Sequence, residues 1–298
     1  MDKIALLENL ERLAHKLRKL GLHPVTRLGR HFLSILLRDI TIQVDDLFLT
    51  GSIRHRGYLS SLRQGKREAY MTHLFKAMLR PGMVVCDIVS YIGYYALLAA
   101  QRVGNSGRVF AFEPDPHNFA YLSRNIQTNS LGCIIIAVQK AVSDQSGCRP
   151  FYIHEGDRSR SSLFWREGNV REMTVECVRL DEFIDEFLGD ETRGVDLIKM
   201  DIEGGELQAL KGMERTLTSS PSMVMFVECN PKALQAAGGD ARQLIEILEN
   251  YGFVVQVIDE QEMRLKTVTS EIKTAKYVNL FCKRGDLYAR RESDVSNR

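Results

Sequence analysis

The chain has 298 residues, enough to bury a sizeable hydrophobic core without disulfide or metal staples. Hydrophobic residues make up 44% of it and charged residues 26%, as in ordinary globular proteins, and a net charge of +2 gives no whole-molecule case for nucleic-acid binding. The six cysteines lack C-x-x-C spacing, no apolar run is long enough to cross a bilayer, and the start Met-Asp-Lys has no signal-peptide pattern, so we expect buried free thiols, no transmembrane segment and a cytoplasmic location.

Residues 1–65 are predicted to form an N-terminal extension. Leucines recur at steps of three and four over residues 3–20, which is the pattern of an amphipathic helix, and Gly21 ends it. Ile40–Val44 and Leu47–Leu49 flank a pair of aspartates, which predicts a β-hairpin. The extension holds more basic than acidic residues. We expect its helix to pack on the main domain or to form a homodimer, and attachment to an anionic membrane surface or partner is the alternative.

Residues 66–284 are predicted to form one α/β domain, with 285–298 as a disordered tail. From Met83 onward, short apolar runs alternate with helical patterns, which is typical of a mostly parallel sheet with helices on both faces. We therefore expect a doubly wound, mostly parallel seven-stranded sheet whose last two strands form an antiparallel pair. Strands are expected near residues 83–86, 109–112, 134–139, 149–153, 173–178, 195–200, 223–227, 253–258 and 277–282, and helices near 66–79, 94–104, 116–128, 181–188, 206–217 and 241–251.

Acidic residues follow the predicted strands one after another. In open α/β sheets, ligands bind beyond the carboxyl ends of the strands, so these acids are expected to share one binding edge. They are Asp87, Glu113, Asp144, Asp201 with Glu203, and Glu228, in strand order.

The loop after the first of these strands limits the choice of cofactor. A dinucleotide site requires G-x-G-x-x-G, but this loop carries Val89 and Tyr91, and the chain has no Gly-Lys-Ser/Thr phosphate loop. A nicotinamide-dependent oxidoreductase is therefore a weak interpretation. S-adenosylmethionine has no phosphate and needs an acid for its ribose and another near its adenine amine, which Glu113 and Asp144 would provide.

The residues from about Gly65 to Phe281 resemble the FkbM family of S-adenosylmethionine-dependent methyltransferases. The matching stretches are Arg80-Pro81-Gly82, Asp87 with Ile92-Gly93-Tyr94-Tyr95, Val109–Pro116, Arg124-Asn125-Ile126, Ala141–Asp144, Ser161-Ser162-Leu163, Val178–Asp181, Asp196–Glu206, Leu210-Lys211-Gly212 and Phe226-Val227-Glu228. The resemblance implies a class I, Rossmann-like methyltransferase fold. It also implies that the cofactor binds at Asp87, Tyr91, Ile92, Gly93, Glu113, Pro114, Ala141 and Asp144. The first turn departs from the family pattern Asp-x-Gly-Ala-Asn-x-Gly, because Val89, Ser90 and Tyr91 replace Gly, Ala and Asn.

The activity that the family implies is O-methylation of a hydroxyl on a sugar, polyketide or similar small molecule. An alcohol is a poor nucleophile, so a base that takes its proton helps the reaction. We assign this role, or that of a positioning group, to Asp201, with Glu203 in support. The alternative for Glu203 is capping of the helix that follows. A methyltransferase fold kept only as a non-catalytic binding or assembly module is the alternative for the whole chain.

The acceptor and a metal are assigned by position alone. Ser161, Ser162 and Glu228 are candidate acceptor-binding residues. The loop Asp157–Trp165 could close over the acceptor, with Trp165 stacking on a sugar ring or anchoring the loop. Asp201, Glu228 and Asn230 offer the hard oxygen ligands that Mg²⁺ prefers, which makes a divalent metal a weaker hypothesis.

Overall fold

The structure is a computed structural model that describes residues 39–154, 161–164, 169–189, 194–273 and 275–285. The predicted helix over residues 3–20, Trp165 with most of its loop, and the tail beyond residue 285 lie outside these ranges. The chain divides into two compact units, residues 1–67 and 68–298, and each is described by itself.

The first unit contains the predicted hairpin. Strands β1 (Asp39–Val44) and β2 (Leu47–Ser52) pair in antiparallel register, and Asp45 adopts a positive φ of 51° in the turn between them. A short 3₁₀ helix, η1 (Ile53–His55), leads into α3 (Arg56–Arg63). Ile40 and Ile42 of β1, Leu47 and Leu49 of β2, and one face of α3 are buried, so the hairpin and the helix share a small apolar core.

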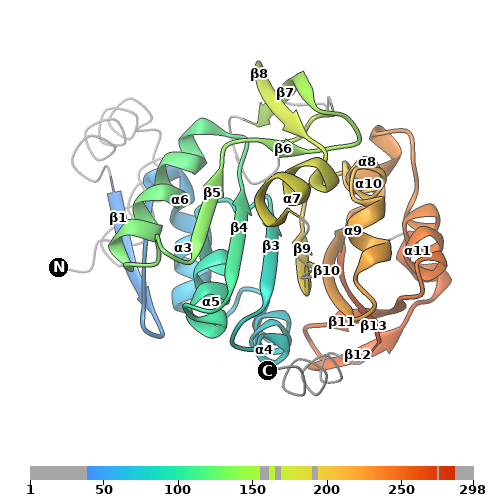
Figure 1. The fold of residues 1–298 in the computed structure, drawn as a ribbon, viewed down its shortest axis with the longest axis horizontal. Helices are drawn as coiled ribbons and strands as arrows, with labels where there is room; N and C mark the ends of the chain where they lie inside the picture. Colours follow the sequence, from blue (N-terminus) through green and yellow to red (C-terminus); the bar gives the residue numbers. More distant parts are fainter. Residues whose placement is uncertain (1–38, 155–160, 165–168, 190–193, 274, 286–298) are drawn as a thin grey trace, which may run out of the picture. The chain divides into compact units, whose positions relative to one another are not determined.

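The second unit is built on one mixed sheet with the order β12-β11-β13-β10-β9-β3-β4-β5 (Figure 1). Its strands are β3 (Val84–Ile88), β4 (Arg108–Phe112), β5 (Ile135–Val138), β9 (Leu197–Met200), β10 (Met223–Cys229), β11 (Val254–Asp259), β12 (Arg264–Thr267) and β13 (Val278–Arg284). The five strands from β5 to β10 are mutually parallel. Strand β13 pairs antiparallel with β11, as predicted, and also with β10. The expected seven strands are joined by an eighth, β12, which pairs with β11 at the sheet edge. Sequence patterns do not predict β12, because this strand is short, polar and largely solvent-accessible.

Helices cover both faces of this sheet, which confirms the doubly wound α/β class. They are α4 (Ala69–Met78), α5 (Tyr94–Val103), α6 (Pro116–Thr128), α7 (Leu180–Leu188), α8 (Glu206–Lys211), α9 (Glu214–Ser219), α10 (Pro231–Ala236) and α11 (Ala241–Asn250). Leucine side chains of α8, α9 and α11 enter one continuous core with the strands, while Phe75 of α4 packs on Phe226 of β10 with ring centroids 5.4 Å apart. Within the described ranges, no helix is long and apolar enough to span a bilayer.

The helix predicted over residues 206–217 is two helices instead. The chain bends at Gly212, where a Cβ atom would lie 2.0 Å from the carbonyl oxygen of Ser143. The carbonyl of Gly212 also accepts the amide of Asp181 at 3.0 Å. Contacts with segments distant in sequence therefore end α8, and helical periodicity alone does not reveal them.

Two of the predicted strands lie outside the main sheet. Strands β6 (Ala141–Val142), β7 (Gly147–His154) and β8 (Val170–Val178) form a separate three-stranded sheet with the order β6-β8-β7. A small cluster of Ala141, Phe151, Ile153, Val175 and Cys177 forms its own core. This sheet belongs to the connection between β5 and α7.

All six cysteines are free thiols, and Cys86, Cys177, Cys229 and Cys282 are buried as predicted. Cys133 and Cys148 are exposed, which corrects the expectation for these two. Cys133 lies in the turn before β5, and Cys148 occupies a solvent-accessible position of β7, so neither thiol reaches the core.

The N-terminus of α4 is capped by a distant side chain. Glu68, the residue before the helix, has a φ of 46° and makes no side-chain cap. The amides of Tyr70 and Met71 instead donate to the two carboxylate oxygens of Glu260, each at 2.9 Å. The carboxylate also complements the positive end of the helix dipole, so it ties α4 to the turn between β11 and β12.

We expect Glu260→Ala to lower the free energy of unfolding by about 2 kcal/mol, because it leaves two helix amides without their charged acceptor. The free energy of unfolding of Glu260→Gln should lie between those of Glu260→Ala and the parent, because the glutamine amide has one acceptor oxygen where the carboxylate has two. Urea denaturation measures both effects. Glu249→Ala, at an exposed position of α11, is the matched control; equal losses at the two positions would contradict the role given to Glu260.

Candidate functional site

Asp87 is the last residue but one of strand β3 and is 1% exposed. Neither of its carboxylate oxygens has a hydrogen-bond partner among the described residues. The Nζ atom of Lys199 lies 3.8 Å from Oδ1. Burial raises the pKa of Asp87 above its usual value, and the nearby ammonium of Lys199 opposes that rise. A buried carboxylate that accepts no hydrogen bond is costly even beside an ammonium, and it marks a position where a cationic or hydrogen-bonding ligand would be favoured.

The loop after Asp87 keeps a tight turn despite its unusual residues. The Ser90 amide donates to the Phe112 carbonyl at 2.8 Å, and the Ser90 hydroxyl donates to the Asp87 carbonyl at 2.9 Å. Val89, Tyr91 and Gly93 all adopt positive φ angles, of 63°, 55° and 98°. At Gly93 a Cβ atom would lie 2.7 Å from a methyl group of Leu122, so glycine is required there. The backbone thus adopts a glycine-like path at two positions that carry larger side chains.

Val89 is the most strained of these positions, since a β-branched residue at positive φ is a genuine outlier. We expect Val89→Gly to be more stable than Val89→Ala by about 1 kcal/mol, because glycine accepts this conformation and alanine does not. At an ordinary strand position the order is reversed. The same pair of substitutions at the exposed Val254 of β11 is the control, with urea midpoints as the measurement. An alanine variant at position 89 that equals or exceeds the glycine variant would argue against strain.

Glu113 follows β4 and is held in one orientation by its surroundings. Its Oε2 accepts the Tyr91 amide at 2.8 Å, and its Oε1 accepts the Asp115 amide at 3.0 Å and the Asn118 side chain at 3.4 Å. A carboxylate offers about four acceptor positions, so about one remains for a ligand. Burial raises the pKa of Glu113 to about 8. The adjoining Ile92, Gly93 and Pro114 are buried against the same turn.

Asp144 follows β6 of the three-stranded sheet, after the buried Ala141. Its Oδ1 accepts the Ser143 hydroxyl at 3.1 Å and forms an ion pair with Arg149 at 3.1 Å. Its Oδ2 has no hydrogen-bond partner among the described residues, and the side chain is 27% exposed. The carboxylate can therefore accept one further donor from solvent or a ligand.

Asp201 and Glu203 follow β9, Glu228 lies near the end of β10, and these three side chains bring carboxylate oxygens within 4.8 Å of one another. Burial raises the pKa of Glu228, and the neighbouring carboxylates raise it further, which favours its neutral form. Lys199 lies beside this group, with its Nζ 3.8 Å from Asp201 as well as from Asp87. Burial alone would disfavour the Lys199 ammonium, but the surrounding carboxylates outweigh it and raise the pKa of Lys199.

Asn230 makes two hydrogen bonds beside these acids. Its amide oxygen accepts the Ala233 amide at 3.2 Å and so caps α10, and its amide nitrogen donates to Glu203 at 3.2 Å. The metal site of Asp201, Glu228 and Asn230 stays a prediction, and Glu203 adds a further carboxylate beside it. The Gly204 amide, directly before α8, donates to Glu206, whose pKa burial raises to about 7, and the capping role of Glu203 stays a prediction as well.

Ser161 and Ser162 use their hydroxyls within the protein. The Ser162 hydroxyl donates to the carbonyl of Glu203 at 2.9 Å and accepts the Phe164 amide at 3.2 Å. The Ser161 hydroxyl accepts the His154 amide at 3.2 Å. Both serines therefore anchor the described part of their loop, and Ser162 does so directly beside Glu203.

Sequence reasoning missed Lys199 and Glu206. Lys199 had a usable signal, since it is the only charged residue in the otherwise apolar strand Leu197–Met200. A lysine in a buried strand needs a carboxylate nearby, and Asp87 and Asp201 were already expected at this edge. Glu206 had no comparable signal, because an acid in the first turn of a helix is common.

Comparisons with known proteins identify a family. The model of the methyltransferase FkbM domain matches residues 87–255. The hexuronic acid methyltransferase AglP of Haloferax volcanii is 27% identical over 166 residues, which cover 55% of this chain and 64% of that protein. The methyltransferase sdnD of Sordaria araneosa is 24% identical over 214 residues, covering 63% and 80%. The 2-O-methyltransferase NoeI of Sinorhizobium fredii is 26% identical over 194 residues, covering 59% and 75%.

The chain thus spans just under two thirds of the length of AglP and more of the other two relatives. The family match begins at Asp87, the buried acid of the first turn, and includes Glu113, Asp144, Asp201, Glu203 and Glu228. Because this match covers more than half of the chain, the protein belongs to the FkbM methyltransferase family.

Proposed function

We propose that the protein transfers a methyl group from S-adenosylmethionine to a hydroxyl group of a sugar or a related small molecule. The observation that carries the proposal is Asp87, a buried carboxylate that accepts no hydrogen bond from the described residues, at an edge rich in acids. S-adenosylmethionine carries an ammonium and a sulfonium charge. Both would be stabilised by carboxylates in a poorly solvated site.

Each of three acids would bind a different group of the cofactor. Asp87 would accept the ammonium group, the remaining acceptor position of Glu113 would take a ribose hydroxyl, and the free Oδ2 of Asp144 would take the adenine amine. Tyr91, Ile92, Gly93, Pro114 and Ala141 would line the path between these groups. The fit supports a phosphate-free nucleoside, because this edge offers acceptors where a phosphate would need donors.

Asp201 would act on the acceptor. The acceptor oxygen forms a bond to the methyl carbon while the carbon–sulfur bond breaks, and Asp201 takes the hydroxyl proton, which leaves a methyl ether and a neutral thioether. Glu203, held by Asn230, and the neutral Glu228 would orient the acceptor oxygen by hydrogen bonding. Much of the rate would come from holding oxygen, carbon and sulfur in line. Ser161 and Ser162 would shape the acceptor side by fixing their loop.

The name of one relative, a hexuronic acid methyltransferase, supports a sugar as the acceptor, and the name of another, a 2-O-methyltransferase, supports transfer to oxygen. A test uses labelled S-adenosylmethionine with a panel of hexuronosides, neutral hexosides and phenols, and mass spectrometry of the products. We expect methyl ethers of the sugars. A chelator arm is included because the oxygens of Asp201, Glu203 and Glu228 could hold a divalent ion.

Titration calorimetry with S-adenosylmethionine tests the cofactor directly. We expect binding by the parent protein and loss of most of it in Glu113→Gln, which places an amide opposite the amides that the carboxylate now accepts. No binding at millimolar cofactor would overturn the proposal and favour a non-catalytic module, for which the strained Val89 speaks. Unchanged affinity in Glu113→Gln would refute the ribose assignment alone.

A further inference from the structure

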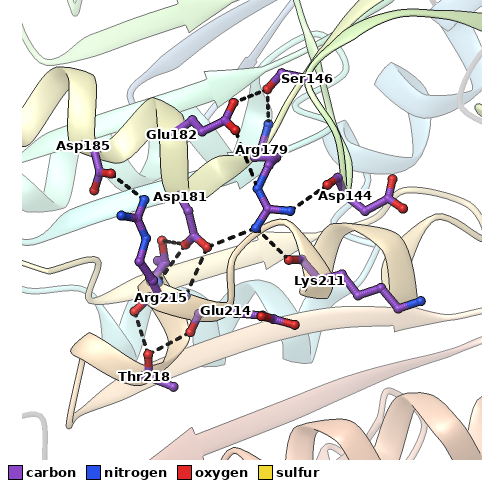
Figure 2. A network of polar contacts seen from close by, with 11 residues as sticks. Asp144, Ser146, Arg179, Asp181, Glu182, Asp185, Lys211, Glu214, Arg215 and Thr218 are labelled. Atoms are coloured by element: carbon purple, nitrogen blue, oxygen red, sulfur yellow. Dashed lines mark hydrogen bonds and ion pairs between the residues drawn. The ribbon is translucent and has the colours of Figure 1, made fainter.

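Arg179, between β8 and α7, joins the turn that carries Asp144 to the end of α8 (Figure 2). Its guanidinium donates to the Asp144 carbonyl at 2.7 Å and to the Lys211 carbonyl at 3.2 Å. Its own amide donates to the Ser146 hydroxyl at 3.1 Å. One side chain thus holds two backbone segments together, and its backbone holds a third point of the same turn.

The ion pairs of Arg179 fix the guanidinium itself. It lies 3.7 Å from the buried carboxylate of Asp181 and 3.8 Å from the exposed carboxylate of Glu182. Asp181 in turn accepts the amides of Arg215 and Thr216, at 3.1 and 2.8 Å, and so caps α9. The guanidinium therefore rests on a carboxylate that is anchored in the helix start behind it (Figure 2).

The contact between the Asp144 turn and the end of α8, called the joint below, is also closely packed. Gly212 follows Lys211, and a Cβ atom at this glycine would lie 2.0 Å from the Ser143 carbonyl oxygen. The backbone at Ser143 therefore packs directly against the backbone at Gly212, next to the two carbonyls that Arg179 bridges. This contact fixes the Asp144 turn against the bend between α8 and α9.

Helix α8 connects the bend at Gly212 to Asp201 and Glu203. It is only six residues long, and Glu206 in its first turn accepts the amide of Gly204, directly after Glu203. A short helix with both ends held is a rigid spacer, so the position of the Asp144 turn is fixed relative to Asp201 and Glu203.

We propose that Arg179 is a positioning residue for the adenine end of the cofactor, which it would never touch. The inference rests on the proposed function, in which Asp144 receives the adenine amine. Arg149 holds the carboxylate of Asp144 in place, at 3.1 Å, whereas Arg179 holds the backbone that carries it. Bidentate bridging of two carbonyls needs the planar fork of arginine, and lysine offers a single point charge instead.

The test is Arg179→Lys, with two ligands measured by calorimetry. S-adenosylhomocysteine carries the adenine and the amino acid, whereas 5′-methylthioadenosine lacks the amino acid. We expect Arg179→Lys to weaken both ligands by the same factor, about tenfold, the effect of one lost charge-assisted hydrogen bond. Asp87→Asn should weaken only the first ligand. Arg215→Lys, at an exposed ion pair with Asp185 in the same network, is the matched control and should change neither.

Hydrogen exchange of the ligand-free protein gives a second readout. We expect the amides of residues 141–147 to exchange faster in Arg179→Lys, with the rest of the chain unchanged. Unchanged affinities, a loss confined to S-adenosylhomocysteine, or faster exchange throughout the molecule would each overturn the inference. A parent protein that binds neither ligand would refute the proposed function instead, and the exchange pattern would still test the joint.

Discussion

Replacing Lys199 with methionine is expected to lower the free energy of unfolding by about 3–5 kcal/mol, the usual cost of removing one partner from a buried ion pair. Lys199 is 6% exposed and lies 3.8 Å from the carboxylates of both Asp87 and Asp201. Its ammonium also lies 5.3 Å from the centre of the Tyr95 ring. Methionine has a similar length and is apolar, so it fills the space but leaves Asp87 buried without a counter-charge.

A matched control and a double variant separate this charge effect from packing. Lys211→Met makes the same change at an exposed position and should alter stability by less than about 0.5 kcal/mol. Asp87→Asn combined with Lys199→Met should recover part of the loss, because the uncompensated charge is gone. A Lys199→Met variant as stable as Lys211→Met in urea denaturation would show that Lys199 does not balance these acids.

The loss should also depend on pH. Burial already raises the pKa of Asp87 in the folded protein, and Lys199 opposes that rise. An acid whose folded pKa lies above its unfolded pKa binds protons more readily when folded, so stability falls as the pH rises toward the folded value. Without Lys199 this fall should be steeper. The stability gap between the parent and Lys199→Met should therefore be narrower at about pH 5 than at about pH 8.

Sequence patterns predicted the parts of the site that follow from strand order. Parallel strands end at one edge, so acids placed after successive strands must come together there. The meeting of Asp87 and Asp201 at Lys199 bears out that geometry. The parallel core, the antiparallel last pair and the helix over Pro116–Thr128 followed in the same way from local apolar periodicity and turn residues.

Other features depend on contacts between residues far apart in the chain, and local patterns do not carry them. The bend at Gly212 is set by the Ser143 carbonyl, and the start of α4 is set by Glu260, 190 residues away from Tyr70. The hydrogen bond from the Asn230 amide to Glu203, 27 residues away, has the same origin. Only the folded chain brings the two partners of each contact together.

Asp201→Asn is expected to slow methyl transfer by about 10²–10⁴-fold, the range that a positioned general base contributes. The substitution keeps the shape of the side chain and removes its ability to take a proton. The side chain is 27% exposed beside the buried Lys199, so it is open to an acceptor from one side. The measurement is the rate of transfer to whichever sugar the panel identifies, at saturating S-adenosylmethionine.

Cofactor affinity decides how the Asp201→Asn result is interpreted. If Asp201 is the base, calorimetry should show nearly unchanged binding of S-adenosylmethionine while the rate falls. If binding falls by the same factor as the rate, Asp201 belongs to the cofactor site and not to the proton transfer. Asp185→Asn, at an exposed ion pair on α7, is the control and should change neither quantity. A transfer rate within twofold of the parent would remove Asp201 from the chemistry, and the neighbouring Glu203, which approaches within 4.8 Å, would be the next base to test.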